Sequence, residues 1–165
     1  MRVTDKHVFF WGEWPSNWYS SPFKATINGQ EYKFYNSEQY FMCMKAITFG
    51  DSDMAEQIIK FGGNPRVAKA MGRKVSNYDD KVWNEKRYEV MLAANLLKYE
   101  QNEDIREKLL SDAFEGKGFV EASPVDKIWG IGCDEATALD DESNWNGQNL
   151  LGKVLDEVRK RLKNS

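Results

Sequence analysis

Residues 36–46 read NSEQYFMCMKA, and this stretch predicts the helix around which the rest of the fold can be laid out. Asn36 or Ser37 can cap its first turn, because a short polar side chain there accepts a hydrogen bond from a free backbone N–H. Gln39, three residues after Asn36, completes a capping-box pattern. The predicted helix runs over residues 37–49.

The same stretch places charge where a helix is expected to be apolar. Glu38, Phe41, Met42 and Lys45 fall at i, i+3, i+4 and i+7, so they share one face of the helix. A charge on a buried face costs several kcal/mol unless it is paired or functional. Two interpretations stay open on this pattern alone: the two charges mark the solvated edges of an ordinary amphipathic helix, or they line a site.

The neighbouring segments predict a small sheet and further helices. Asn28-Gly29 between two alternating runs is a strong hairpin signal. Proline after Asn64 and glycine at 72 delimit a short helix. The predicted strands are 7–11, 24–27, 31–35 and 119–122, and the predicted helices are 37–49, 53–60, 65–71, 79–99, 102–113 and 149–162. The fold class is therefore α+β: a compact, mainly helical single domain over residues 1–165 with a small antiparallel sheet.

Composition excludes several classes of protein. The 165 residues are 41% hydrophobic and 30% charged, which is a globular balance. No apolar run approaches the roughly 18 residues that a membrane span needs, and no signal peptide begins the chain, so we expect a cytoplasmic protein. A net charge of −3 argues against broad electrostatic binding of nucleic acid. Cys43 and Cys133 lack metal-ligand spacing and are expected to be free thiols.

The sequence lacks the residues that several common kinds of catalytic and ligand-binding site require. His7 is the only histidine, and it opens a strand-like run where a structural role is expected. No zinc ligand set and no phosphate-binding loop of the Gly-rich type is present, so neither a metal nor a cofactor is expected. The acidic run 140–142 is interpreted as a solvated loop. An enzyme of this sequence would work with carboxylates, a lysine and aromatic rings.

A second unusual stretch is FVEASPVDKIWGIG, residues 119–132. Glu121 and Asp126 bracket a Ser-Pro turn whose proline restricts the backbone on both sides. Trp129 and two glycines follow, which allows a close approach to a ligand or to another part of the chain. The alternatives are a functional loop, or a turn in which Asp126 is only a cap and Trp129 fills the core.

Taken together, the motifs resemble the YbiA-like N-glycosidases, a superfamily also called NADAR. The resemblance covers about residues 9–159, and its longest motifs are SEQYF with the following lysine and EASPxDxxWGxG. The matching segments are 16–23 (SNWYSSPF), 36–46, 49–51 (FGD), 68–75 (AKAMGRKV), Trp83 with Arg87, 120–132 and 145–155 (WNGQNLLGKVL).

The resemblance implies a hydrolase that splits an N-glycosidic bond. In one branch of the family the substrates are ribosylamino-pyrimidine phosphates of riboflavin biosynthesis. In another branch, ADP-ribose is removed from guanine bases. The implied partner is thus a small-molecule ribosylated base or an ADP-ribosylated guanine. A non-catalytic module that binds a nucleotide or ADP-ribose is the alternative from another class; such a module would need no acid and base.

The resemblance also assigns candidate catalytic residues. Cleavage of an N-glycoside builds positive charge at the anomeric carbon and requires a proton on the departing nitrogen. Glu38 and Asp126 are the candidates for this carboxylate chemistry, and Glu38 is preferred for orienting water because a helix N-terminus favours an ionised carboxylate. Lys45 would hold a ribose hydroxyl, orient Glu38 or form a Schiff base with the opened sugar. Glu121 would order Lys45 or bind ribose hydroxyls.

Aromatic and basic residues complete the predicted site. Base stacking on an aromatic ring contributes about 1–3 kcal/mol, although a tryptophan is more often part of a core. Trp83 and Trp129 are the preferred candidates for stacking the base, and Trp18 in the first loop is a further candidate. Arg87 and Arg73 are candidates for a phosphate, because a guanidinium pairs with phosphate oxygens. For Arg87, a salt bridge to an acidic neighbour is the alternative.

Overall fold

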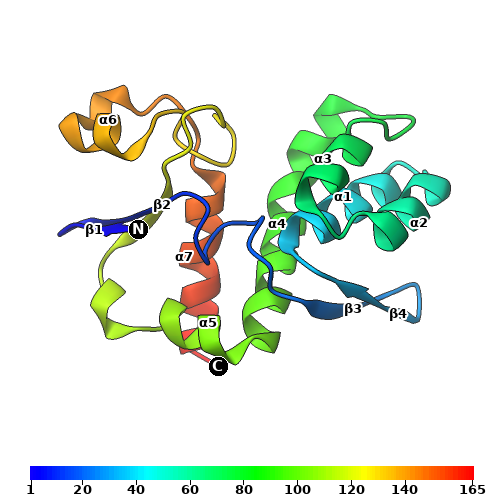
Figure 1. The fold of residues 1–165 in the computed structure, drawn as a ribbon, viewed down its shortest axis with the longest axis horizontal. Helices are drawn as coiled ribbons and strands as arrows, with labels where there is room; N and C mark the ends of the chain where they lie inside the picture. Colours follow the sequence, from blue (N-terminus) through cyan, green and yellow to red (C-terminus); the bar gives the residue numbers. More distant parts are fainter. The chain divides into compact units, whose positions relative to one another are not determined.

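The computed structural model describes residues 1–165 and is mainly helical with two small sheets, so the expected α+β class is confirmed (Figure 1). The helices are α1 (Ser37–Thr48), α2 (Ser52–Phe61), α3 (Pro65–Gly72), α4 (Asp80–Gln101), α5 (Glu103–Leu109), α6 (Glu135–Asp140) and α7 (Leu150–Lys163). The strands are β1 (Arg2–Val3), β2 (His7–Phe10), β3 (Phe23–Ile27), β4 (Gln30–Phe34) and β5 (Gly118–Glu121).

The contacts divide the chain into two compact units. The central unit comprises residues 17–103 and contains β3, β4 and α1 to α4. The terminal unit joins residues 1–16 to residues 104–165 and contains β1, β2, β5, α6 and α7. That the whole chain forms one domain stays a prediction.

In the central unit, β3 and β4 form the predicted hairpin. Asn28 and Gly29 both have positive φ angles, 51° and 80°, which is the conformation that a two-residue hairpin turn requires. Phe23 lies opposite Phe34 in the antiparallel register, and their rings stack with centroids 5.9 Å apart. Tyr40 of α1 meets both rings edge-on, so the hairpin is packed against the first turns of α1.

The start of α1 follows the predicted cap, with one difference. The Oδ1 atom of Asn36 accepts a hydrogen bond from the backbone N–H of Gln39 at 2.9 Å, as expected. The Gln39 side chain, however, accepts from the N–H of Tyr35 at 2.8 Å rather than from Asn36, and its Nε2 donates to the carbonyl of Ile58 at 3.0 Å. The fully buried Gln39 therefore caps α1 and links it to α2.

The starts of α3 and α4 are also where the sequence predicts them. Asn64 accepts a hydrogen bond from the N–H of Arg66, and Pro65 takes the first helical position of α3. Asp79 accepts from the N–H of Val82 and begins α4, the longest helix. These caps are local chemistry, which explains why they could be read from the sequence.

The terminal unit differs from the predicted antiparallel sheet. β1 pairs with β2 in antiparallel fashion, but β5 pairs with β2 in parallel, with Val8 opposite Phe119. Parallel pairing joins segments far apart in the sequence, so no turn signal announces it. One hydrophobic cluster of this unit consists of Phe9, Val120, Ala122, Ile131 and Ala138.

Two helix predictions in the terminal unit are corrected. α5 ends at Leu109 rather than near residue 113, and a short 3-10 turn, Asp112–Phe114, follows it with Ser111 as its cap. α6 was not expected: Asp134 caps it, and the acidic run interpreted as a loop is split between the end of α6 and a second 3-10 turn, Glu142–Asn144.

The predicted helix position of Asn102 is also wrong. Asn102 begins the predicted helix 102–113, where an asparagine would cap the helix, but its Nδ2 donates to the carbonyls of Lys98 and Pro22, at 2.8 and 3.0 Å. An amide that donates to carbonyls closes the end of α4 rather than opening a new helix.

Candidate active site

Glu38 lies in the first turn of α1, and the structure buries it. Only 7% of its surface is exposed, and its backbone N–H donates to the carbonyl of Asn17 at 3.2 Å. This bond anchors the loop before β3 to the start of α1. The free N–H groups and the dipole of a helix N-terminus favour an ionised carboxylate there, which compensates part of the cost of burial.

Lys45 is half-buried two turns further along the same face. Burial lowers the pKa of Lys45 below its usual range, the negative charge of Glu38 opposes this lowering, and the positive charge of Arg73 adds to it. Lys45 is therefore close enough to both Glu38 and Arg73 to respond to their charges. The predicted pattern of a carboxylate and an ammonium on one helical face is thus present, on a face that is closed to bulk water at Glu38.

Two aromatic rings lie against the lysines of this region. The ammonium of Lys45 is 4.6 Å from the ring centroid of Tyr78, and the ammonium of Lys69 on α3 is 6.0 Å from that of Trp18. Trp18 is 40% exposed and Tyr78 43% exposed, so part of each ring remains in contact with solvent. We call Glu38, Lys45, Arg73 and Tyr78, which are connected through Lys45, the α1 cluster.

The two members of the Trp83 motif lie in different surroundings. Trp83 is buried, and its ring contacts those of Phe41 and Phe49 at centroid distances of 5.0 and 6.2 Å. Arg87 is half-buried and donates to the amide oxygen of Asn84 at 2.8 Å, not to a carboxylate. Their assignment to base stacking and phosphate binding stays a prediction.

In the terminal unit, Asp126 takes part in a tight turn. Its Oδ1 atom accepts from the N–H groups of Ile128 and Trp129, at 2.9 and 2.8 Å. The hydroxyl of Ser123 accepts from the N–H of Asp126 at 3.1 Å. Asp126 is therefore a cap, as one of the two interpretations held. Both of its bonds end on Oδ1, which leaves Oδ2 available for other chemistry.

The residues after Asp126 are fixed by backbone hydrogen bonds. The N–H of Ile131 donates to the carbonyl of Glu121, and the N–H of Leu151 donates to that of Trp129. At Gly130 an added Cβ would lie 2.9 Å from the carbonyl oxygen of Glu121, so only glycine fits this close approach. Trp129 itself is half-buried.

Asn149 has a role that the sequence did not reveal. It begins the predicted helix 149–162, where a polar residue of this kind would cap the helix, but it has a φ of 52° and makes no side-chain cap bond. Its amide instead accepts from the N–H of Glu121 and donates to the carbonyl of Phe119, both at 3.0 Å. Asn149 thus extends the hydrogen bonding of β5 as a neighbouring strand would, and it fixes the backbone at the half-buried Glu121.

The nine predicted site residues are shared between the units. The central unit holds Trp18, Glu38, Lys45, Arg73, Trp83 and Arg87, and the terminal unit holds Glu121, Asp126 and Trp129.

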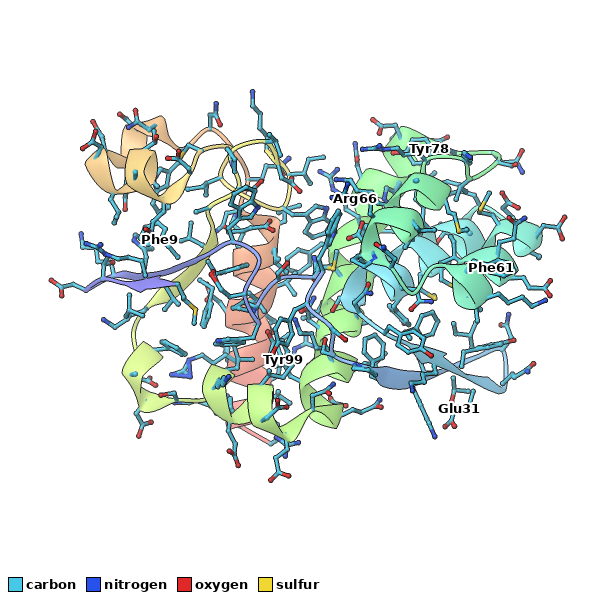
Figure 2. The ribbon with its side chains drawn as sticks, viewed as in Figure 1. Phe9, Glu31, Phe61, Arg66, Tyr78 and Tyr99 are labelled. Carbon is cyan, nitrogen blue, oxygen red and sulfur yellow. The ribbon has the colours of Figure 1, made fainter.

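Sequence reasoning missed Tyr78 and Lys69. A signal existed for Lys69, because residues 57–78 contain five lysines and arginines and no acid. Within that stretch Arg66, Lys69 and Arg73 recur at the spacing of one helical face. Figure 2 labels Arg66 on α3 and Tyr78 at the top of the same unit. Tyr78 had no signal of its own.

The structure offers little support for a cysteine nucleophile, a metal site or a membrane span. Both cysteines are free, and burial raises the pKa of the Cys43 thiol to about 12, which suppresses the reactive thiolate. No group of three His, Cys, Asp or Glu side chains is arranged to hold a metal ion. None of the helices combines the length and apolar character needed to cross a bilayer.

Comparison with known families gives a match over nearly the whole chain. The model of the NADAR domain matches residues 9–163. Among relatives, the protein irg-1 of Caenorhabditis elegans is 46% identical over 157 residues, which cover 90% of this chain and 73% of the relative. N-glycosidase R617 of Acanthamoeba polyphaga mimivirus is 39% identical over 166 residues, covering 94% of this chain and 96% of the viral protein.

A bacterial relative connects the sequence to a solved structure. N-glycosidase YbiA of Escherichia coli K12 is 32% identical over 147 residues, covering 89% of this chain and 79% of YbiA. The NMR structure of E. coli YbiA superimposes with a TM-score of 0.75 at 29% identity, over 98% of this chain and 88% of that one. The likeness extends through both the central and the terminal unit.

Proposed function

The chain belongs to the NADAR family, and we propose that it is an N-glycosidase that hydrolyses the bond between a ribose phosphate and a base-like amine. The relatives R617 and YbiA are named as N-glycosidases. Our proposed substrate class is the ribosylamino-pyrimidine phosphates.

One observation supports the proposal most strongly: a buried carboxylate and a lysine share one face of α1. Glu38 is 7% exposed, and burial lowers the pKa of Lys45. Buried ionisable groups with shifted pKa values are costly to fold and concentrate at functional sites. A module that only binds a nucleotide does not require an acid for proton transfer, so the buried Glu38 favours an enzyme.

The proposed reaction is a hydrolysis at the anomeric carbon. The C–N bond breaks with its electron pair going to nitrogen, and the oxygen of a water molecule bonds to the anomeric carbon. Glu38 stabilises the positive charge on the sugar and accepts the proton that the water loses. By resemblance to the family motif, we assign to Asp126 the protonation of the departing nitrogen; its Oδ1 accepts the two hydrogen bonds of the turn, and Oδ2 takes part in neither.

Arg73 and Trp18 bind the two ends of the substrate. Arg73 pairs with the phosphate, since a guanidinium offers parallel N–H donors to phosphate oxygens. Trp18 is 40% exposed and provides a face on which the base stacks. Lys45 orients Glu38 and the ribose hydroxyls.

The test is to incubate the protein with a ribosylamino-pyrimidine 5-phosphate and to measure free ribose 5-phosphate. We expect release by the wild-type protein and none above background by Glu38→Gln. The matched control is Glu56→Gln, because Glu56 is an exposed α2 carboxylate paired with Lys60 at 2.7 Å. Equal release by the wild type and Glu38→Gln would refute the assignment.

A parallel incubation with ADP-ribosylated guanine measures the release of ADP-ribose, which is the activity of the other branch of the family. We expect slower release from this substrate. Faster release of ADP-ribose than of ribose 5-phosphate would overturn the proposed substrate class while keeping the reaction type.

A further inference from the structure

Lys45 lies between an acid, a guanidinium and a ring. Its ammonium is 4.6 Å from the centroid of Tyr78, and its pKa responds to the charges of Glu38 and Arg73. We propose that Tyr78 is a positioning residue for Lys45, whose ring holds the lysine ammonium in place beside Glu38. The proposal rests on the proposed function only for the consequence in catalysis, because the positioning itself can be measured without substrate.

The structure holds the Tyr78 ring from both sides. The phenol hydroxyl donates to Asp80 at 2.7 Å, and the ring meets that of Phe49 edge-on at a centroid distance of 5.3 Å. Only the face near Lys45 and the exposed edge remain for other contacts. A ring fixed at its hydroxyl and packed against a second ring has little freedom to turn away from the ammonium.

The loop that carries Tyr78 is itself anchored. Asn77 has a φ of 61°, a left-handed conformation that asparagine tolerates better than most residues. Just before it, the N–H of Ser76 donates to Asp51, whose other oxygen caps α2. Asp51 therefore ties this loop to α2, and the sharp turn at Asn77 directs the following tyrosine.

The anchor of Tyr78 continues along α4. Asn84 donates to the second oxygen of Asp80 at 3.3 Å, and Arg87 donates to Asn84 at 2.8 Å. A line of hydrogen bonds thus runs from Arg87 through Asn84 and Asp80 to the hydroxyl of Tyr78. This line gives Arg87 a supporting role in the central unit.

An aromatic face is a suitable partner for this lysine. A ring attracts a cation through its quadrupole but accepts no proton and carries no net charge. A carboxylate in the place of Tyr78 would compete with Glu38 for the ammonium. The charged groups around the pair are Glu38 on α1, Arg73 after α3, and Asp79, Asp80 and Arg87 near the phenol.

The experiment compares two substitutions that separate the ring from its hydroxyl. Tyr78→Phe keeps the ring and loses the bond to Asp80, whereas Tyr78→Leu keeps an apolar side chain and loses the ring. The pKa of Lys45 is followed in each protein by NMR titration of ¹³C-labelled lysine, with the Lys45 signal identified by its absence in Lys45→Arg. Tyr35→Leu is the matched control: Tyr35 is 44% exposed, belongs to the same unit and lies 5.0 Å from the ammonium of Lys33.

We expect the pKa of Lys45 in Tyr78→Leu to be lower than in Tyr78→Phe by about half a pH unit, because the cation–π attraction stabilises the charged lysine. Tyr35→Leu should leave the Lys45 pKa unchanged. A Lys45 pKa in Tyr78→Leu equal to or above that in Tyr78→Phe would overturn the proposal.

Turnover of the ribosylamino-pyrimidine phosphate gives the second readout. The value of kcat should fall about threefold to tenfold in Tyr78→Leu and recover in Tyr78→Phe, with KM little changed, because the ring acts on Lys45 and not on the substrate. A loss of kcat equal in both variants would contradict a positioning role for the ring. If the wild type cleaves no N-glycoside, the proposed function fails, and the NMR titration still decides whether Tyr78 positions Lys45.

Discussion

The α1 cluster and the turn at Asp126 use charged side chains in opposite ways. Glu38 and Lys45 are withdrawn from bulk water, and the pKa of the lysine is shifted by its burial. Asp126, in contrast, uses one carboxylate oxygen to satisfy two backbone N–H groups of its own turn. Burial of the charged Glu38 and Lys45 costs folding free energy, whereas the two hydrogen bonds of Asp126 stabilise the fold.

This difference indicates how substitutions should separate. In the α1 cluster, removal of a charge should lower activity and leave folding intact or improved, since a buried charge is costly. In the turn, activity and stability should separate only when the substitution keeps the backbone hydrogen bonds.

The largest effect is expected for Glu38→Gln. Loss of a general base typically costs 10²–10⁴-fold in rate, and we expect a fall of about 10³-fold in kcat. The thermal midpoint should stay the same or rise, because the amide is cheaper to bury than a carboxylate. Single-turnover kinetics and a melting curve on the same sample check both parts. A stability loss with unchanged kcat would reverse the interpretation of α1.

The next effect is expected at Asp126, with two variants. Asp126→Asn keeps the Oδ1 acceptor and should fold like the wild type, while its kcat falls about 10²-fold because the amide supplies no proton. Asp126→Ala loses both hydrogen bonds and should lose about 1–2 kcal/mol of unfolding free energy as well. Urea unfolding and kcat are measured for both. Full activity of Asp126→Asn would make this residue a turn cap and nothing more.

A purely structural effect is expected for Asn149→Ala. The substitution leaves the N–H of Glu121 and the carbonyl of Phe119 without partners. Each unsatisfied backbone group costs about 1–3 kcal/mol, so the loss of both partners should lower the unfolding free energy by at least about 2 kcal/mol. Asn36→Ala, which removes the cap of α1 and the bond from Asn36 to the carbonyl of Gly63, should cost about 1–2 kcal/mol and provides the comparison in the central unit. Urea unfolding measures both, and a loss well below about 1 kcal/mol in Asn149→Ala would contradict the stabilising role of its two bonds to β5.

The smallest effect concerns a lysine outside the α1 cluster. Lys98 on α4 is fully buried, and burial lowers its pKa to about 7. Between pH 7 and the usual lysine range, the unfolded chain binds the proton that the folded chain has released, so stability rises with pH.

Lys98→Met removes this dependence. From pH 7 to 8.5, the wild-type unfolding free energy should gain up to about 1 kcal/mol per pH unit relative to the variant. Urea unfolding at four pH values measures the difference. A constant difference over this range would show that Lys98 titrates elsewhere.

The sequence predicted features that depend on neighbouring residues. The hairpin at Asn28-Gly29 and the starts of α1, α3 and α4 rest on local hydrogen bonds and φ angles, and all four are confirmed. The parallel pairing of β5 with β2 was not predicted, because it joins residues more than 100 positions apart.

At the site, too, features within one element could be predicted from the sequence, whereas contacts between distant segments could not. The helical spacing of Glu38 and Lys45 could be read directly, since one helix carries both residues. Tyr78 could not, because its direction depends on Asn77 and on the bond from Ser76 to Asp51. Asn149 stands directly before the last helix, where a cap is expected. Its side-chain amide bonds instead to β5, a strand that lies far from it in the sequence.

The most direct test of the central claim is a crystal structure of the Glu38→Gln protein with an uncleaved ribosylamino-pyrimidine phosphate. We predict that the anomeric carbon lies about 3.5 Å from the side chain at position 38, as a reacting geometry requires. A bound ligand whose glycosidic bond does not contact that side chain would contradict the assignment of Glu38.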